Sequence, residues 1–166
     1  FNTISPFTEQ KALKSLEAAQ EEFLSNGLTS VHDAGCDPNT LEMIKRLYES
    51  GRLCMRLYTF MRIPDGSTTL GDEFYASGRQ IGMYHNSLTI RGIKISIDGA
   101  LGSHGALMLQ GFSDRSDGYP GLQRVDRERL FALIKRAHEA GFQTAVHAIG
   151  DAANRQALDV FEQVLK

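Results

Sequence analysis

The chain contains few of the features that mark several large classes of protein. Only two of its 166 residues are cysteines, Cys36 and Cys54, and they lie far apart and form no CxxC pattern. Scattered thiols of this kind are typical of reduced, cytoplasmic proteins. The net charge is only −2, so no basic surface indicates nucleic acid or an anionic membrane as a partner. No apolar run approaches the length that spans a bilayer. We therefore expect a cytoplasmic protein that binds neither nucleic acid nor a membrane.

The start of the chain also lacks familiar signals. It begins Phe1-Asn2-Thr3, without an initiator methionine, and no signal-peptide pattern follows. This start fits either a processed chain or an internal piece of a longer protein. A chain of 166 residues can bury one hydrophobic core, so we expect a single domain over residues 1–166.

Amphipathic helices and apolar strands alternate along the chain. Three of the predicted helices end at glycines that suit a left-handed cap, namely Gly27, Gly51 and Gly141. The hydrophobic periodicity predicts helices over about 8–26, 39–50, 126–140 and 151–165, and strands over about 28–31, 53–61, 90–98 and 142–146.

Two segments between these elements carry weaker patterns. Residues 64–66 have the composition of a turn, and residues 70–86 predict one short helix. We expect that helix to bury part of three apolar side chains, those of Phe74, Ile81 and Met83. In the last helix we expect the inward face to consist of Leu158, Phe161, Val164 and Leu165.

The repeated order of helix, glycine and strand predicts an α/β fold with a parallel sheet. A closed (β/α)8 barrel needs eight strands, and the pattern supplies four. The sheet is therefore either small and open or part of a larger barrel.

One strand carries polar side chains on a single face. In the segment 93–99, isoleucines alternate with Lys94, Ser96 and Asp98. Because alternate residues of a strand point to opposite faces, one face is apolar and the other offers an amine, a hydroxyl and a carboxylate. Such a face is either solvated or directed into an active site. In the interior of a barrel, Lys94 would be partly desolvated, which lowers the pKa of its amine.

Three polar residues lie at the ends of predicted strands, and the carboxyl ends of parallel strands carry the chemistry of such folds. They are His32, Asp98 and His147. A neutral Lys94 amine could form a Schiff base, or it could react with carbon dioxide to give a metal-binding carbamate. His147 is either a ligand or a histidine satisfied by one backbone carbonyl. The residues around His32 match no standard zinc pattern.

A glycine-rich stretch, 99–121, has neither a helical nor a strand period. It contains no GxGxxG fingerprint, and its length predicts a lid or a binding loop. His104 is one of the polar residues that it offers. Asp151 precedes the last helix, where we expect it to cap the free amides of the first turn.

Three segments, 27–35, 93–103 and 141–151, resemble the amidohydrolase-3 branch of the amidohydrolase superfamily, which includes N-substituted formamide deformylase-like proteins. The resemblance implies a distorted (β/α)8 TIM-type barrel, of which this chain would form about strands two to five with their helices. It also implies one or two divalent metal ions, zinc above all. The reaction would be hydrolysis of amide-like, non-peptide C–N bonds in a small molecule by a metal-bound hydroxide.

The resemblance also assigns roles to individual residues. Lys94, carbamylated in many relatives, and His147 would be metal ligands. Asp98 would line the site beside Lys94 as a catalytic residue. The residues expected nearby as substrate or loop contacts are His32, His104 and Asp151.

The chain departs from the family pattern as well. It lacks the His-x-His of strand one, the histidine of strand six and the aspartate of strand eight, and His104 stands where many relatives have arginine. We therefore expect the chain alone to bind metal weakly, to have no turnover and to self-associate through its open barrel edges. Two alternatives stay open: a Schiff-base lyase or aldolase that uses Lys94, and a non-catalytic binding or regulatory module.

Overall fold

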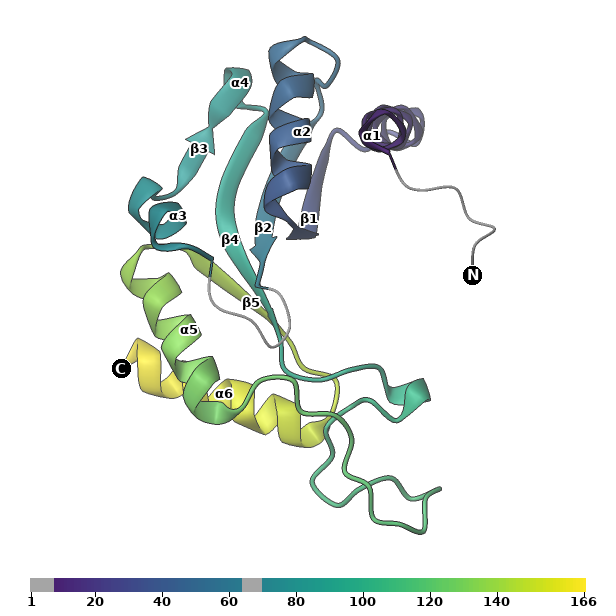
Figure 1. The fold of residues 1–166 in the computed structure, drawn as a ribbon, viewed down its shortest axis with the longest axis vertical. Coiled ribbons are helices and arrows are strands. Elements are labelled where there is room, and N and C mark those ends of the chain that lie inside the picture. The colour runs from purple at the N-terminus through teal and green to yellow at the C-terminus, as the bar shows by residue number, and fades with distance from the viewer. Residues whose placement is uncertain (1–7, 64–69) are drawn as a thin grey trace.

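The computed structural model describes residues 8–63 and 70–166 (Figure 1). The turn predicted at 64–66 lies outside these residues. In chain order the larger elements are α1 (Glu9–Ser25), β1 (Ser30–Cys36), α2 (Pro38–Glu49), β2 (Arg56–Arg62), β4 (Leu88–Ser96), α5 (Arg127–Glu139), β5 (Gln143–His147) and α6 (Asp151–Leu165). The shorter ones are α3 (Asp72–Ser77), β3 (Gln80–Gly82), α4 (Met83–Asn86) and the 3₁₀ turn η1 (Leu101–Ser103).

The strands form one five-stranded sheet. β1, β2, β4 and β5 are parallel neighbours in that order, and the short β3 pairs antiparallel with β4 at Ile90. Parallel strands that alternate with helices are the arrangement of a partial TIM-type barrel, which confirms the predicted fold class. Figure 1 shows α2 lying across β1 and β2, with α5 and α6 side by side next to β5.

Local sequence signals account for the helix boundaries. Asp37 caps α2 by accepting hydrogen bonds from the amides of Asn39 and Thr40, and Asp126 caps α5. The hydrogen bonds from Thr40 hold the pKa of the Asp37 carboxyl below its usual value. The glycines predicted to follow helices all have positive φ, as a left-handed cap requires: Gly27, Gly51 and Gly141.

The core lies between the sheet and its helices, and β4 is at its centre. Ile93, Ile95 and Ile97 are at most 1% exposed, whereas Lys94 and Ser96 on the opposite face are half-buried. The alternation predicted for this strand is therefore confirmed. The helices meet the isoleucines with buried side chains of their own, among them Leu41, Ile44 and Leu47 from α2, Leu130, Leu133 and Ile134 from α5, and Ala153 and Val160 from α6.

Two expectations about helices are wrong. Residues 70–86 form two short helices and a strand, and Ile81 is 60% exposed because β3 pairs only with the start of β4. In α6, Leu158 and Leu165 are also exposed. The buried side of α6 uses small residues, because the helix packs closely against α5 and the sheet.

The cysteines are unpaired, as their spacing in the sequence predicted. Both Cys36 and Cys54 are free thiols, and burial raises the pKa of Cys36 to about 12. Among residues 8–63 and 70–166, no helix has the length and apolar character needed to cross a membrane.

On the sheet face that carries Lys94 and Ser96, which we call the inner face, close packing gives a testable prediction at Gly92. A Cβ at Gly92 would lie 2.1 Å from Cδ1 of Phe60 on the neighbouring strand, so Gly92→Ala must displace that ring. We expect a destabilisation of about 1–3 kcal/mol in urea unfolding, since overpacking costs that much. Gly35→Ala is the matched control, because a Cβ there meets nothing within 4 Å. Equal stability of the two variants would contradict the packing at Phe60.

Candidate active site

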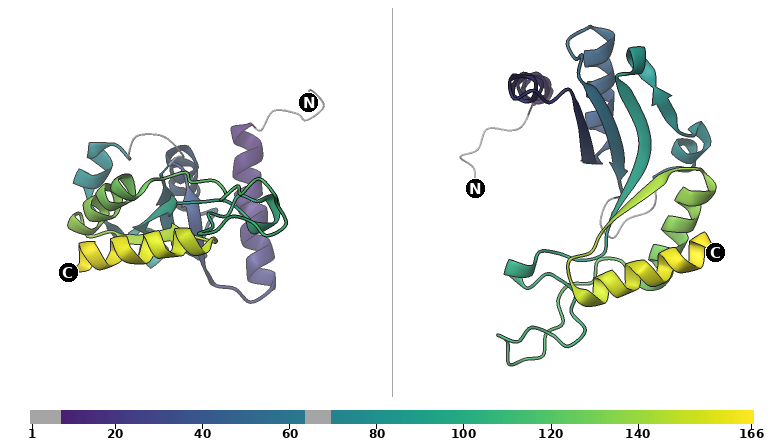
Figure 2. Two further views of the ribbon diagram at one scale, coloured as in Figure 1. Left: turned by 90° about the horizontal axis from the view of Figure 1, so that it is seen from below. Right: turned by 180° about the vertical axis from the view of Figure 1, so that it is seen from behind.

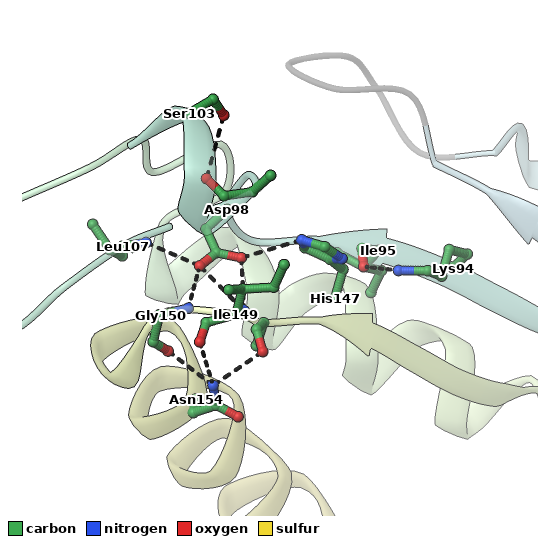
Figure 3. Close-up of polar contacts among 11 residues, drawn as sticks. Lys94, Ile95, Asp98, Ser103, Leu107, His147, Ile149, Gly150 and Asn154 are labelled. Atoms are coloured by element: carbon green, nitrogen blue, oxygen red, sulfur yellow. Dashed lines mark hydrogen bonds and ion pairs between the residues drawn. The ribbon is translucent and has the colours of Figure 1, made fainter. Parts of the chain in front are cut away.

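The carboxyl ends of β4 and β5 bring together Lys94 and His147. Strand register pairs Ser96 with His147 and Lys94 with Ala145. Residues paired in this way point to the same face of a sheet, and Lys94 lies two residues before Ser96. Lys94 and His147 are thus diagonal neighbours on the face opposite the buried isoleucines (Figure 3).

Lys94 is a half-buried amine with few polar contacts. Its Nζ donates to the backbone oxygen of Ile95 at 3.2 Å. Burial lowers the pKa of the amine below its ordinary value, because desolvation penalises the ammonium form. No carboxylate in the described part of the chain forms an ion pair with it. The neutral form, which is the nucleophilic one, is therefore favoured relative to an exposed lysine.

Asp98 lies just beyond β4 and is only 1% exposed. Its carboxylate accepts hydrogen bonds from the backbone amides of Leu107 at 2.9 Å, Ile149 at 3.1 Å and Gly150 at 2.8 Å. These donors belong to two separate loops, one after β4 and one after β5 (Figure 3). A buried carboxylate requires such donors, so Asp98 holds the two loops together.

His147 ends β5 next to this carboxylate. Its Nε2 lies 3.5 Å from Oδ1 of Asp98, and its side chain is 34% exposed. Its backbone oxygen accepts a hydrogen bond from the amide of Ile97, which continues the pairing with β4 past the end of the strand. This hydrogen bond fixes the end of β5 relative to β4, so the imidazole lies beside Asp98 while part of the ring is exposed to solvent.

The long loop after β4 is anchored at several points. The amide of Gly99 donates to the oxygen of Gly105, and the oxygen of Leu107 accepts hydrogen bonds from the start of α6. The amide of Leu109 donates to Asp151 at 2.8 Å. Beyond these anchors the loop projects past the carboxyl end of the sheet, as the right-hand view of Figure 2 shows. The irregular loop predicted for 99–121 is confirmed, apart from the single turn η1.

The position predicted for His32 is wrong. β1 continues through Cys36, because His32, Asp33 and Cys36 pair with β2, so His32 lies inside the strand and not after it. Its ring stacks on Tyr58, with centroids 4.9 Å apart.

His32 also lies at a different height in the sheet from the pair Lys94 and His147. Tyr58, its partner, pairs with Thr89, whereas His147 pairs with Ser96. Thr89 precedes Lys94 by five residues and Ser96 by seven, with an irregularity between Ile90 and Gly92, so the separation is about 15–20 Å along the strand. Strand register therefore separates His32 from that pair.

The other two loop residues occupy defined places. His104 has a left-handed backbone and pairs with Asp114 at 2.9 Å, which lowers the pKa of that carboxyl. Its described contacts stay within the loop, where its ring also meets Phe112 edge-on. Asp151 is not the cap of α6, because Gly150 occupies that position. Its carboxylate still accepts a hydrogen bond from one first-turn amide, that of Ala152 at 2.8 Å, and it also anchors Leu109 of the long loop.

Sequence reasoning missed two polar residues near the site. The Asn154 side chain donates to the backbone oxygens of Ala148 and Gly150 and so closes the turn after β5. Its place four residues after Gly150 was the only signal. Arg62 is the last residue of β2 and pairs in register with Lys94. The predicted strand ended at residue 61, so Arg62 was not expected to be part of the sheet.

The chemistry of Lys94 and His147 suits part of a metal centre. A lysine with a lowered pKa and an imidazole with one ring nitrogen turned to a carboxylate both suit a metal ligand. Within the described ranges no group of three or more His, Cys, Asp or Glu side chains is placed to hold a metal ion. Lys94 and His147 therefore fit part of a ligand set and do not complete one.

Comparisons with known proteins define the class of this chain. The family model described as "Amidohydrolase family" matches residues 1–166, so the chain belongs to the amidohydrolase family. Two solved structures titled as uncharacterized metal-dependent hydrolases are similar to it. The one from Pyrococcus furiosus has a TM-score of 0.81 and 29% identity over 99% of this chain and 33% of its own. The one from Pyrococcus horikoshii has a TM-score of 0.79 and 30% identity over 95% and 31%.

A curated relative is also much longer than this chain. "Protein LONG AFTER FAR-RED 3" of Arabidopsis thaliana is 33% identical over 161 residues, which cover 91% of this chain and 27% of that protein. The chain thus spans about a quarter to a third of the length of the relatives to which it is similar.

The seating of the long loop on the start of α6 gives a second prediction. A Cβ at Gly150 would lie 1.8 Å from the backbone oxygen of Leu107, so Gly150→Ala must push the loop away from Asp98. We expect hydrogen exchange of the Leu107 amide to accelerate by at least about tenfold, since its bond to a buried charge is lost. Gly102→Ala, where a Cβ meets nothing within 4 Å, should leave that exchange unchanged. Unchanged hydrogen exchange of Leu107 in Gly150→Ala would contradict the described contact of the long loop with Gly150 and Asp98.

Proposed function

We propose that this chain forms the part of a metal-dependent amidohydrolase barrel that supplies Lys94 and His147 as ligands. The observation that carries the proposal is the register of β4 and β5, which puts the two side chains next to each other on the inner face. Membership of the amidohydrolase family and similarity to two metal-dependent hydrolases support it. The remaining ligands would come from outside residues 1–166.

The proposed reaction is hydrolysis of an amide-like, non-peptide C–N bond in a small molecule. The metal, which we propose to be zinc as one or two ions, would lower the pKa of a bound water and polarise the substrate carbonyl. Lys94 contributes through its lowered pKa, because a neutral amine adds to carbon dioxide and releases a proton to give a carbamate. His147 contributes an imidazole whose position is held by the strand end and by Asp98.

The surroundings of the pair suit this role. Burial of the isoleucine face leaves Lys94 and Ser96 on the side that a closed barrel would enclose. The anchored loop over 99–121 projects from the same end of the sheet and offers His104 as a candidate substrate contact, and Asp151 at the start of α6, which holds Leu109 of that loop, is another. Arg62, in register with Lys94, is a further candidate from β2.

The proposal extends to the state of the isolated chain. We propose one domain over residues 1–166, in a cytoplasmic protein, since one apolar cluster joins the sheet to α2, α5 and α6 and both cysteines are free thiols. β1 and β5 each pair on one side only among the described residues, which leaves two open edges. We expect the chain alone to self-associate, because open edges and apolar surface invite pairing. Light scattering should report a dimer or a larger assembly, and a clean monomer would count against this.

Metal binding tests the ligand pair directly. The 166-residue chain, incubated with Zn²⁺ or Mn²⁺ and dialysed, should retain less than one tightly held equivalent and show no turnover, since a catalytic zinc site needs at least three protein ligands. In a titration of the weak site, Lys94→Ala and His147→Ala should each reduce affinity by at least about tenfold. His138→Ala, an exposed histidine of α5, is the matched control and should have no effect.

Two results would contradict the proposal. Wild-type affinity in both alanine variants would remove the pair as ligands. Borohydride trapping of a carbonyl compound on Lys94 would favour the Schiff-base lyase, which uses the same lowered pKa. A carbamate carbon signal with labelled bicarbonate, present in the wild type and absent in Lys94→Ala, would support the amidohydrolase.

A further inference from the structure

The two oxygens of Asp98 have different neighbours. Oδ2 accepts hydrogen bonds from the amides of Leu107 at 2.9 Å and Gly150 at 2.8 Å. Oδ1 accepts from the amide of Ile149 at 3.1 Å and lies 3.5 Å from Nε2 of His147. Every hydrogen-bonding group described around this carboxylate other than the imidazole is therefore a donor. These donors match the two acceptor oxygens of a carboxylate.

An acceptor next to one imidazole nitrogen selects a tautomer. A neutral imidazole carries its proton on one nitrogen and a lone pair on the other. With Oδ1 of Asp98 facing Nε2, the proton is favoured on Nε2, because a lone pair there would face a negative oxygen. The lone pair is then on Nδ1, the nitrogen that does not face Asp98.

We propose that Asp98 is a positioning residue that holds His147 as the Nε2–H tautomer and leaves Nδ1 free to bind. This role replaces the catalytic one expected from the sequence, since the described contacts of Asp98 are to loop amides and to the imidazole. The same carboxylate ties the loops after β4 and β5 together, so the seat of the loops and the orientation of the imidazole depend on one group. The consequence for metal binding rests on the proposed function, whereas the tautomer does not.

Asp98→Asn separates these roles. The amide oxygen can keep the place of Oδ2 and accept from Leu107, Gly150 and also Ile149, whose amide lies 3.2 Å from that oxygen. The amide nitrogen then takes the place of Oδ1 and donates to Nε2 of His147. The variant should therefore keep the loops in place and reverse the tautomer to Nδ1–H.

The experiment is nitrogen NMR of the 166-residue chain with ¹⁵N-labelled histidine rings, at a pH well above the ordinary imidazole pKa. His147→Ala identifies the signals of His147. We expect the Nε2–H pattern in the wild type and the Nδ1–H pattern in Asp98→Asn. Asp151→Asn is the matched control, because Asp151 also anchors the long loop but has no described contact with the His147 ring. It should keep the Nε2–H pattern.

Three outcomes decide the proposal. An Nδ1–H pattern in the wild type overturns it, and so does an unchanged pattern in Asp98→Asn. A reversal in Asp151→Asn as well would overturn it too, because loosening of the loop would then be the cause.

Zinc affinity is the second measurement, and we expect Asp98→Asn to weaken it about 10- to 100-fold. A reversed tautomer with unchanged zinc affinity would support the positioning role and overturn the assignment of His147 as a ligand.

Discussion

The buried carboxylate of Asp98 joins the loops that follow β4 and β5 at the carboxyl end of the sheet. A carboxylate that is 1% exposed has lost its hydration, and only amides brought to it can offset that cost. Leu107 and Gly150 supply two of them from loops that lie 43 residues apart in the chain. The close approach also excludes a side chain at Gly150. The two loops can therefore meet only in the arrangement that satisfies Asp98.

The sheet then determines which side chains belong to the site. Parallel register puts His147 beside Ser96 and one step from Lys94, and it leaves His32 far down the inner face. The packing of the isoleucines against α5 and α6 keeps β4 from turning over, so the amine stays on the inner face and is partly desolvated. The proposed ligand set is incomplete because the ligands of such a fold come from the ends of several strands, and residues 8–63 and 70–166 form four parallel ones.

Much of the fold was predictable because its signals are local. Apolar periodicity and the glycines that follow helices marked the larger helices, and the alternation of β4 marked its two faces. The errors have non-local causes. Ile81 lies in a strand that only pairing with β4 creates, and β1 extends through polar residues because β2 lies beside it. The exposed leucines of α6 follow from packing against α5, which favours small residues at the contact.

The sequence by itself determined the class of fold, the membership of the amidohydrolase family, and the presence of an amine and an imidazole at neighbouring strand ends. The fold class and the two side chains follow from periodicity and residue type, and the family follows from the resemblance of three segments, so all of them are properties of short stretches of chain. Only the tertiary structure decided that Asp98 is buried among backbone amides and that His147 has one ring nitrogen turned toward it. The reason is physical: the environment of a charge depends on groups that are distant in the chain, and no local pattern encodes which amides will reach it.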